Sequence, residues 1–281
     1  MIRAHHEKHD SSAVIVPSCG FDSIPSDLGT YLLVTAMQNS SPVKRVRSVI
    51  LDLAGGISGG TFSTALHIAE TYSLKELAET YKPFGISPTA AKVPRQKAIL
   101  YDDGWLGPWL MGSTNSAIVY RTCGLLNWLP FSYREYLKYD NIFKAIFFRI
   151  TLAIGPLFLK LSAVRWLARK FGPGIGEGPT EESLRNGRLR MKITADTDEH
   201  SGSIHISADQ DPAYLLTGIV FRISNSAMML VESGLVLARE FQNTPAAKMN
   251  KPKSVVITPA LLGEPLRRRL ENGGLHFYLE V

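Results

Sequence analysis

The sequence predicts an α/β protein, and three observations predict it. An apolar, β-branched run from Ala13 to Val16 ends in a loop rich in Gly, Pro, Ser and Asp, and a helical pattern follows it as far as Ala36. A second strand pattern, from Val46 to Leu53, leads through a glycine-rich turn into another helical pattern. Two alternating segments, 188–195 and 202–208, predict paired strands across a charged turn. We therefore expect helices packed on a mixed sheet.

The first loop collects polar side chains at the carboxyl end of a predicted buried strand. Asp22, Ser23, Ser26 and Asp27 follow Gly20 within a few residues. In open α/β sheets, ligands bind at the carboxyl ends of the strands. Either Ser26 or Asp27 can also cap the following helix, because a short side-chain oxygen satisfies amides of the first turn. An ordinary connection with capping residues therefore stays open as the alternative, since these are also common loop residues.

Composition bounds the class of protein. A chain of 281 residues that is 45% hydrophobic suits one large domain or two small ones. The net charge of +6 is compatible with anionic ligands or a membrane surface. No aromatic-rich motif interleaves with the basic residues, so we expect no nucleic-acid partner. Two cysteines are too few for a disulfide framework or a Cys-based zinc site, and with no recognisable secretory signal they predict an intracellular, reducing compartment.

Histidines near the start of the chain do not predict a metal site. His5 and His9 have the i,i+4 spacing of two ligands on one helical face, but His6 follows His5 where the His-Glu-x-x-His pattern has its Glu. Histidines of this kind are more often solvated, so we assign no metal.

The most hydrophobic segment runs from 142 to 167. Its longest uncharged run, Ile150 to Leu159, is shorter than the roughly 20 residues that cross a bilayer. We expect Gly155 and Pro156 to break it. Cations lie among the large apolar residues, which is typical of a helix in the membrane interface. Helices of the protein core are the alternative.

Positions 20 to 29, Gly-Phe-Asp-Ser-Ile-Pro-Ser-Asp-Leu-Gly, resemble a signature of the saccharopine dehydrogenase-like oxidoreductases. This family includes the trans-acting enoyl reductases of lipid and polyketide pathways. Further blocks resemble the family in the same order, at 58–61, 178–182, 211–214, 229–233 and 258–264. The resemblance therefore covers nearly the whole chain.

The resemblance implies a domain order. Residues 1–42 correspond to the last strand, loop and helix of a truncated Rossmann-type dinucleotide-binding domain. Residues 43–250, with the hydrophobic segment 142–167, correspond to an α+β substrate and dimerisation domain with a mixed sheet. Residues 251–281 correspond to a helix and a strand that return to the first domain.

The resemblance also implies a reaction and its site. The activity would be hydride transfer from NADPH to a lipid-like enoyl or imine substrate. The expected cofactor-binding residues, at the nicotinamide, are Gly20, Phe21, Asp22 and Ser23, and those facing the substrate cleft are Ser58, Gly60 and Thr61. The sequence names no catalytic acid: Asp102 and Asp103 form a pair, but a turn before Gly104 explains them equally well.

Departures from the family leave the enzyme assignment open. The sequence contains no Gly-x-Gly-x-x-Gly turn, with which a dinucleotide domain binds the pyrophosphate. Losing about 4 kcal/mol of such contacts would weaken binding about a thousandfold, so binding of NADP(H) is itself in question. Gln210 and Ala213 replace the family's glycines, and 218–225 resembles an insertion that would disturb the following helix.

The alternative to the reductase is a non-catalytic, lipid-associated or partner-binding remnant of such an enzyme. In either case the resemblance admits a lipid-like small molecule, a peripheral membrane or lipid-droplet contact and a homodimer as partners. We expect the protein in the cytoplasm or peripherally associated with membranes or lipid droplets.

Overall fold

The computed structural model describes residues 13–38, 41–54, 59–76, 99–102, 104–174, 176–177, 188–209, 225–249 and 255–281. Its strands are β1 (Val14–Ile15), β2 (Arg45–Ala54), β3 (Leu100–Tyr101), β4 (Trp105–Pro108), β5 (Ser132–Tyr139), β6 (Arg188–Asp196), β7 (Ser201–Asp209), β8 (Val255–Val256) and β9 (His276–Glu280). Its α-helices are α2 (Ile24–Met37), α3 (Gly59–Thr71), α5 (Gly112–Leu125), α6 (Ile142–Phe158), α7 (Ser162–Phe171), α9 (Asn225–Leu235) and α10 (Gly263–Asn272). Short helical segments are η2 (Val236–Glu240), η3 (Phe241–Asn243), η4 (Ala246–Lys248) and η5 (Pro259–Leu262).

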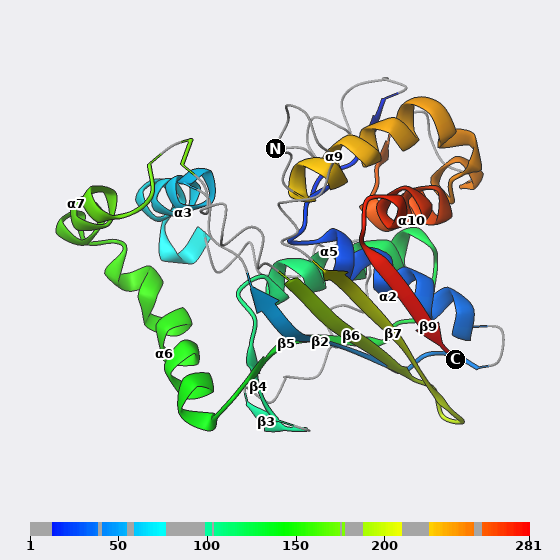
Figure 1. Cartoon of the computed structure of the whole chain (residues 1–281), viewed down its shortest axis with the longest axis horizontal. Coiled ribbons are helices and arrows are strands. Elements are labelled where there is room, and N and C mark those ends of the chain that lie inside the picture. The colour runs from blue at the N-terminus through cyan, green and yellow to red at the C-terminus, as the bar shows by residue number, and fades with distance from the viewer. Residues whose placement is uncertain are drawn as a thin grey trace.

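A seven-stranded mixed sheet forms the centre of the molecule (Figure 1). The strand order is β3-β4-β5-β2-β6-β7-β9, in which β2 and β5 are parallel and the other neighbours are antiparallel. The predicted α/β class and mixed sheet are confirmed. The strand predicted at 46–53 and the pair at 188–195 and 202–208 are also present, as β2, β6 and β7.

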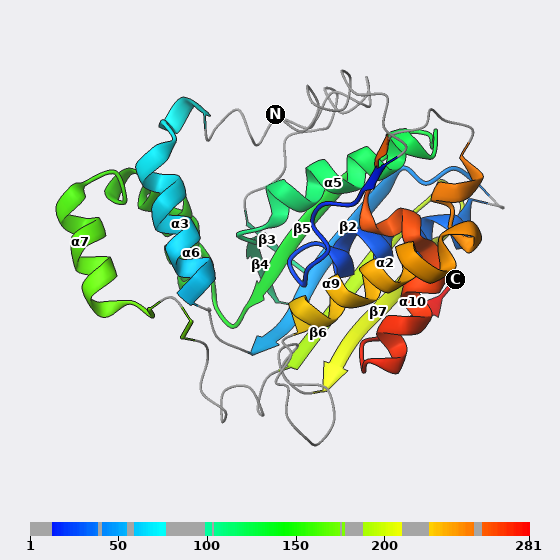
Figure 2. The same cartoon turned by 90° about the horizontal axis from the view of Figure 1, so that it is seen from above.

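Helices α2 and α5 cover one face of this sheet, and α9 and α10 lie beyond α2 (Figures 1 and 2). The pattern of strand β6 explains why helices cover only this face. Its residues Leu189, Met191 and Ile193 alternate with polar residues and are buried in the main core. The polar residues lie on the opposite face, where Arg45 donates to Asp196 at 2.8 Å. The main core contains residues from each of the three predicted domains. The division into these domains stays a prediction.

The start of the chain differs from the expected buried strand and capped helix. Strand β1 is only two residues long, pairs in parallel with β8 outside the large sheet, and leaves Ile15 43% exposed. The following helix begins at Ile24, and Ser23 before it makes no side-chain cap. Ser26 and Asp27 are therefore not caps but buried residues inside the first turn. Their side chains bond to other elements, which gives them a tertiary role.

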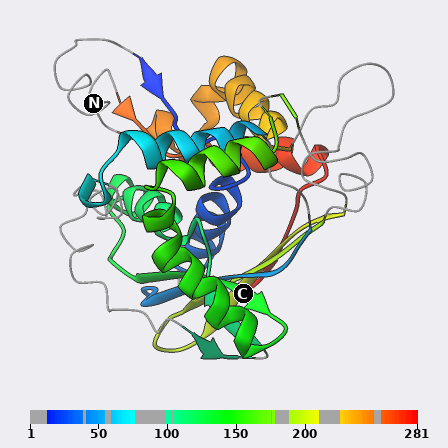
Figure 3. The ribbon, with the colours of Figure 1, turned by 90° about the vertical axis from the view of Figure 1, so that its left-hand side faces the viewer.

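The hydrophobic segment 142–167 forms α6 and α7, which project from the sheet together with α3 (Figures 2 and 3). The core-helix alternative is wrong, because Ala145 is the one buried residue of α6 and α7 has none. The expected break is also misplaced, since Pro156 lies inside α6 and the chain bends after Phe158. In the described part of the chain no single helix is long and apolar enough to cross a membrane; α6 and α7 pass such a test only together, with a bend of 112°.

The long helix predicted up to Phe241 is shorter and irregular. Helix α9 ends at Leu235 and continues as the π-helical segment η2 and the 3-10 segment η3. The Asp211-Pro212 block and the insertion at 218–225, apart from Asn225 itself, lie outside the described residues, as do His5 and His9.

Candidate active site

A small pocket lies beneath the turn that holds Phe21 and Asp22. Its empty volume is about 240 Å3, counting space open to solvent. The turn before α2, the first turn of α2, and strands β2, β5 and β6 all contribute to its wall, together with Trp109. The lining residues are Phe21, Asp22, Pro25, Ser26, Ile50, Trp109, Glu135, Leu189 and Met191.

The backbone of the signature places these side chains. The amides of Ser23 and Ile24 both donate to the carbonyl of Gly20, at 3.2 and 3.0 Å, which closes a tight turn directly before the helix. Asp22 stays exposed at the rim of the pocket, while Ser23 and Ser26 are buried. Partial removal of water around the Asp22 carboxylate raises its pKa.

Glu135 is the acidic group in the buried wall of this pocket. It is 5% exposed and receives hydrogen bonds from three elements. Ser26 Oγ donates to its Oε1 at 3.0 Å, Asn115 Nδ2 donates to the same oxygen at 3.1 Å, and Tyr133 Oη donates to Oε2 at 3.1 Å. Ser23 joins this network through Asn115, to whose Oδ1 its hydroxyl donates at 3.1 Å.

Burial raises the pKa of Glu135 to about 7, although the donors Asn115, Ser26 and Tyr133 favour the carboxylate. A carboxylic acid with a pKa near neutrality can hold a proton and release it under physiological conditions. Because Glu135 also lines a pocket, its proton lies where a bound molecule could receive it.

A second buried carboxyl, Asp27, lies outside the pocket lining and joins three elements. Thr122 Oγ1 on α5 donates to Asp27 Oδ1 at 2.5 Å, and the amide of Ala260 in η5 donates to Oδ2 at 2.8 Å. Thr122 also shares a hydrogen bond with Thr258 at 2.6 Å. Burial raises the pKa of Asp27 to about 7. Because its partners belong to α5 and η5, Asp27 holds these elements against α2.

The structure brings together only some of the residues predicted for the site. Phe21 and Asp22 line the pocket, Ser23 joins the network behind it, and Gly20 forms the turn. Gly60 and Thr61 begin α3 in the projecting part of the molecule, are exposed, and are not among the lining residues. Ser58 lies outside the described residues.

Sequence reasoning missed Glu135 as an acid. Strand β5 alternates Tyr133, Glu135 and Leu137 with Arg134 and Tyr136, so neither face is clearly apolar. A weak signal was present, since Glu135 lies between two large apolar residues on one face.

The pair Asp102 and Asp103 is not part of this site. Asp102 forms an exposed ion pair with Arg47 at 2.6 Å, and Asp103 lies outside the described residues.

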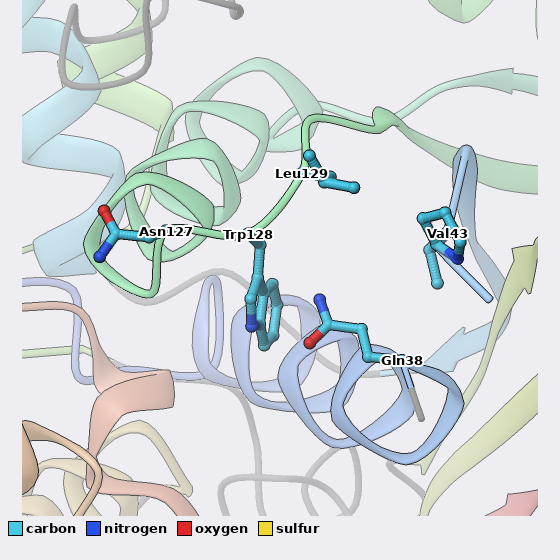
Figure 4. A pocket seen from close by; sticks show the side chains of 6 residues that line it. Gln38, Val43, Asn127, Trp128 and Leu129 are labelled. Atoms are coloured by element: carbon cyan, nitrogen blue, oxygen red, sulfur yellow. The ribbon is translucent and has the colours of Figure 1, made fainter. Parts of the chain in front are cut away.

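A larger pocket lies at the other end of α2, with an empty volume of about 660 Å3, again counting space open to solvent. Figure 4 shows Trp128 beside Gln38, below Leu129 in the loop after α5. Pro42, Val43 and Asn127 complete the wall. None of its six lining residues is titratable, so this pocket offers no group for proton transfer.

Comparison with known proteins places the chain among oxidoreductases. It is 26% identical over 299 aligned positions to a putative trans-acting enoyl reductase of Mycobacterium tuberculosis, covering 96% of this chain and 68% of that protein. It is 25% identical to a trans-acting enoyl reductase of Mycobacterium ulcerans, with the same coverage. It is also 26% identical to a probable mitochondrial saccharopine dehydrogenase-like oxidoreductase of Arabidopsis thaliana, covering 98% of this chain and 68% of that protein.

The chain is therefore similar to trans-acting enoyl reductases and to a saccharopine dehydrogenase-like oxidoreductase. The expected resemblance is confirmed by these alignments, which run along nearly the whole chain. No protein-family model matches it. In this chain the signature at 20–29 forms the turn, the first helical turn and part of the pocket wall just described.

Proposed function

We propose that this protein is an NADPH-dependent reductase of a lipid-like enoyl substrate, with Glu135 as the proton donor. The proposal rests on its relatives, which are named as reductases and dehydrogenase-like oxidoreductases, and on the pocket beneath the Phe21–Asp22 turn. The observation that carries it is the buried Glu135 carboxyl, which lines that pocket and has a pKa raised to about 7.

The side chains that line the pocket are of chemical types that suit the nicotinamide end of such a cofactor. Phe21 and Trp109 are half-buried and offer aromatic surface to a flat ring. Asp22 and Ser26 offer polar groups to a carboxamide. The sequence contains no Gly-x-Gly-x-x-Gly turn for the diphosphate, so the fit covers the ring end alone.

The chemistry divides between the cofactor and this chain. A reduced nicotinamide bound at this pocket would supply a hydride, and the β carbon of a conjugated enoyl group would receive it. The carboxyl proton of Glu135 then goes to the α carbon, so that the carbon–carbon double bond becomes single. Ser26, Asn115 and Tyr133 stabilise the carboxylate that remains, because all three donate to its oxygens. Solvent returns the proton to Glu135.

Cofactor binding is the first test. Purified protein is titrated with NADPH while the fluorescence of the nicotinamide is followed, with NADH as the comparison. Saturable binding in the range of about 1–100 μM, tighter for NADPH, supports the proposal. Absence of binding up to about 1 mM of either cofactor contradicts it and favours the alternative of a non-catalytic relative.

The Glu135→Gln variant tests the proton donor. Gln keeps the shape and can keep the bonds to Ser26 and Tyr133, but it has no acidic proton. We expect turnover to fall by about 100-fold or more, with cofactor affinity unchanged. The matched control is Glu199→Gln, which alters an exposed Glu in the turn between β6 and β7.

The pH profile distinguishes a proton donor from a structural residue. Because the acid form must be present, turnover should decline as the pH rises through about 7, and the residual activity of Glu135→Gln should lack this decline. Wild-type turnover that is independent of pH between about 6 and 8, under conditions where chemistry limits the rate, would remove Glu135 from the mechanism.

A further inference from the structure

Helices α6 and α7, here called the arm, expose large apolar side chains along their length. Phe143, Phe147, Ile150, Ile154 and Leu157 recur at helical spacing along α6 and are each 44–79% exposed. Exposed apolar side chains also lie past the bend, on α7. The other large exposed apolar side chains of the arm are Ile146, Phe158, Leu161, Trp166, Leu167 and Phe171.

No residue of the arm belongs to either core cluster of the described residues. At its base the arm contacts the sheet, where Ala145 packs beside Gly107 and Phe148 lies 5.8 Å from Tyr139, ring centroid to ring centroid. Figures 1 and 2 show the rest of it standing clear of the sheet, and in Figure 3 it lies on the side that faces the viewer. A folded protein rarely exposes apolar surface of this extent unless that surface binds something.

The charge of the arm is as distinctive as its apolar surface. Residues 142–171 contain six of the 31 Lys and Arg residues and none of the 25 Asp and Glu residues. The remaining 25 cations balance the 25 acids, so the whole net charge of +6 corresponds to this stretch. Arg149 is exposed among the phenylalanines, and the ammonium group of Lys170 lies 5.1 Å from the ring of Trp166.

Neighbouring contacts hold the arm in shape. Arg169 on α7 pairs with Glu70 on α3, and Lys160 in the bend donates to the carbonyl of Ala69 at 2.5 Å. The 112° bend between α6 and α7 is thus tied to α3 at two points. The helices that expose the apolar side chains are therefore held in place by contacts with α3.

We propose that the arm docks the protein on an anionic phospholipid surface. Its phenylalanines and Trp166 enter the boundary between headgroups and acyl chains, and Arg149 and Lys170 meet the lipid phosphates. Tryptophan and basic residues with long apolar stems suit this boundary, where one end of the side chain is apolar and the other is wet.

The charge of the arm favours lipid over a second copy of the chain. Two arms packed face to face would bring the exposed Arg149 and Lys170 of one copy against those of the other, with no acid between 142 and 171 on either side to neutralise them. An anionic membrane supplies both the apolar phase and the opposite charge. This inference does not depend on the proposed reduction.

Vesicle flotation tests the proposal with the full chain. Phosphatidylcholine vesicles are compared with vesicles that contain about 30% phosphatidylserine, at low and physiological salt. We expect the protein to float with the anionic vesicles at least about tenfold more strongly than with the neutral ones, and salt to weaken the binding.

Variants separate the apolar contribution from the charge. Phe143→Ser/Phe147→Ser/Phe171→Ser should abolish flotation, and Arg149→Gln/Lys170→Gln should weaken it by about tenfold or more. The matched controls are Leu129→Ser/Leu230→Ser/Tyr278→Ser, which alter equally exposed side chains elsewhere, and Lys44→Gln/Arg268→Gln. All of these side chains are exposed, so the thermal unfolding midpoint should stay unchanged in every variant.

Three results would overturn the proposal. The first is wild-type protein that stays in solution with anionic vesicles. The second is flotation that the triple Phe variant retains. The third is a lipid-free dimer that the triple Phe variant converts to a monomer, which would assign the surface to a second copy of the chain.

Discussion

At the scale of single residues, the signature at 20–29 divides into side chains that face the pocket and side chains that hold the fold. Asp22 lies exposed at the pocket rim, whereas Asp27, five residues later, is fully buried and receives hydrogen bonds from Thr122 and Ala260. Both are acids in one short motif, yet only Asp27 joins separate elements. A substitution of Asp27 should therefore lower the stability of the fold, whereas a substitution of Asp22 should affect ligand binding.

Asp27→Ala should lower the free energy of unfolding by about 2–4 kcal/mol, because it leaves the Ala260 amide and the Thr122 hydroxyl without this buried acceptor. Asp22→Ala should change it by less than about 0.5 kcal/mol and instead weaken nicotinamide binding. Urea unfolding and the NADPH titration measure the two effects. A loss of stability in Asp22→Ala equal to that of Asp27→Ala would show that the turn is structural.

At the scale of elements, α2 decides where the pocket forms. The helix lies against β6 and β7 on one side and against α5 and η5 on the other, so nearly its whole first half is buried. Its approach to the sheet is closest at Gly29, where a Cβ would come within 2.6 Å of Ile206 Cδ1 and 2.8 Å of Ile193 Cδ1. Because Gly29 has no side chain, the helix can pack closely against the strands.

Replacing Gly29 by Ala should therefore force the side chains of Ile206 and Ile193, or α2 itself, to shift. Gly234 in α9 is the matched control, because a Cβ there meets nothing within 4 Å. Gly234→Ala should stabilise the protein by up to about 1 kcal/mol through helix propensity alone. Gly29→Ala should be at least about 1 kcal/mol less stable than Gly234→Ala, because overpacking cancels that gain. Thermal unfolding of both variants measures the difference; equal stabilities would mean that the sheet has room for the methyl group.

At the scale of the whole molecule, one sheet and one main core hold residues from near the beginning of the described chain to its end. The core contains two acids, Asp27 and Glu135, with pKa values raised to about 7 from ordinary values of 3.8 and 4.5. The folded protein therefore holds these protons more tightly than the unfolded chain does. Its overall stability should depend on pH for this reason.

A raised pKa of this kind stabilises the fold fully below the unfolded value, and the contribution is lost as the pH rises through the folded value. We expect the free energy of unfolding to fall between about pH 4 and pH 7, by up to about 1.4 kcal/mol per pH unit for each acid, and then to level off. Urea unfolding at several pH values measures this. Asp27→Asn combined with Glu135→Gln should flatten the decline, and an unchanged slope in the double variant would assign it to other groups.

Some features could be predicted from local patterns and others could not. Strands β6 and β7 alternate strictly and have a charged turn, so their pairing follows from the local sequence. Ser26 and Asp27 have the residue types of helix caps, and only their bonds to Glu135 and Ala260, more than 100 positions away, reveal their actual role. Local signals carry no information about partners at that separation.

The sequence by itself determined the α/β class, the mixed sheet and the resemblance to saccharopine dehydrogenase-like oxidoreductases. The fold class depends on the periodicity of apolar residues, and the resemblance depends on the order of short motifs. Tertiary structure alone decided that Glu135 is buried beneath the signature turn and that the arm lies outside the core. The physical reason is that burial depends on which elements meet. The local sequence around a Glu in a strand, or a Phe in a helix, is the same whether the side chain faces a core, a pocket or a lipid surface. Which of these environments it has is decided by the packing of the elements.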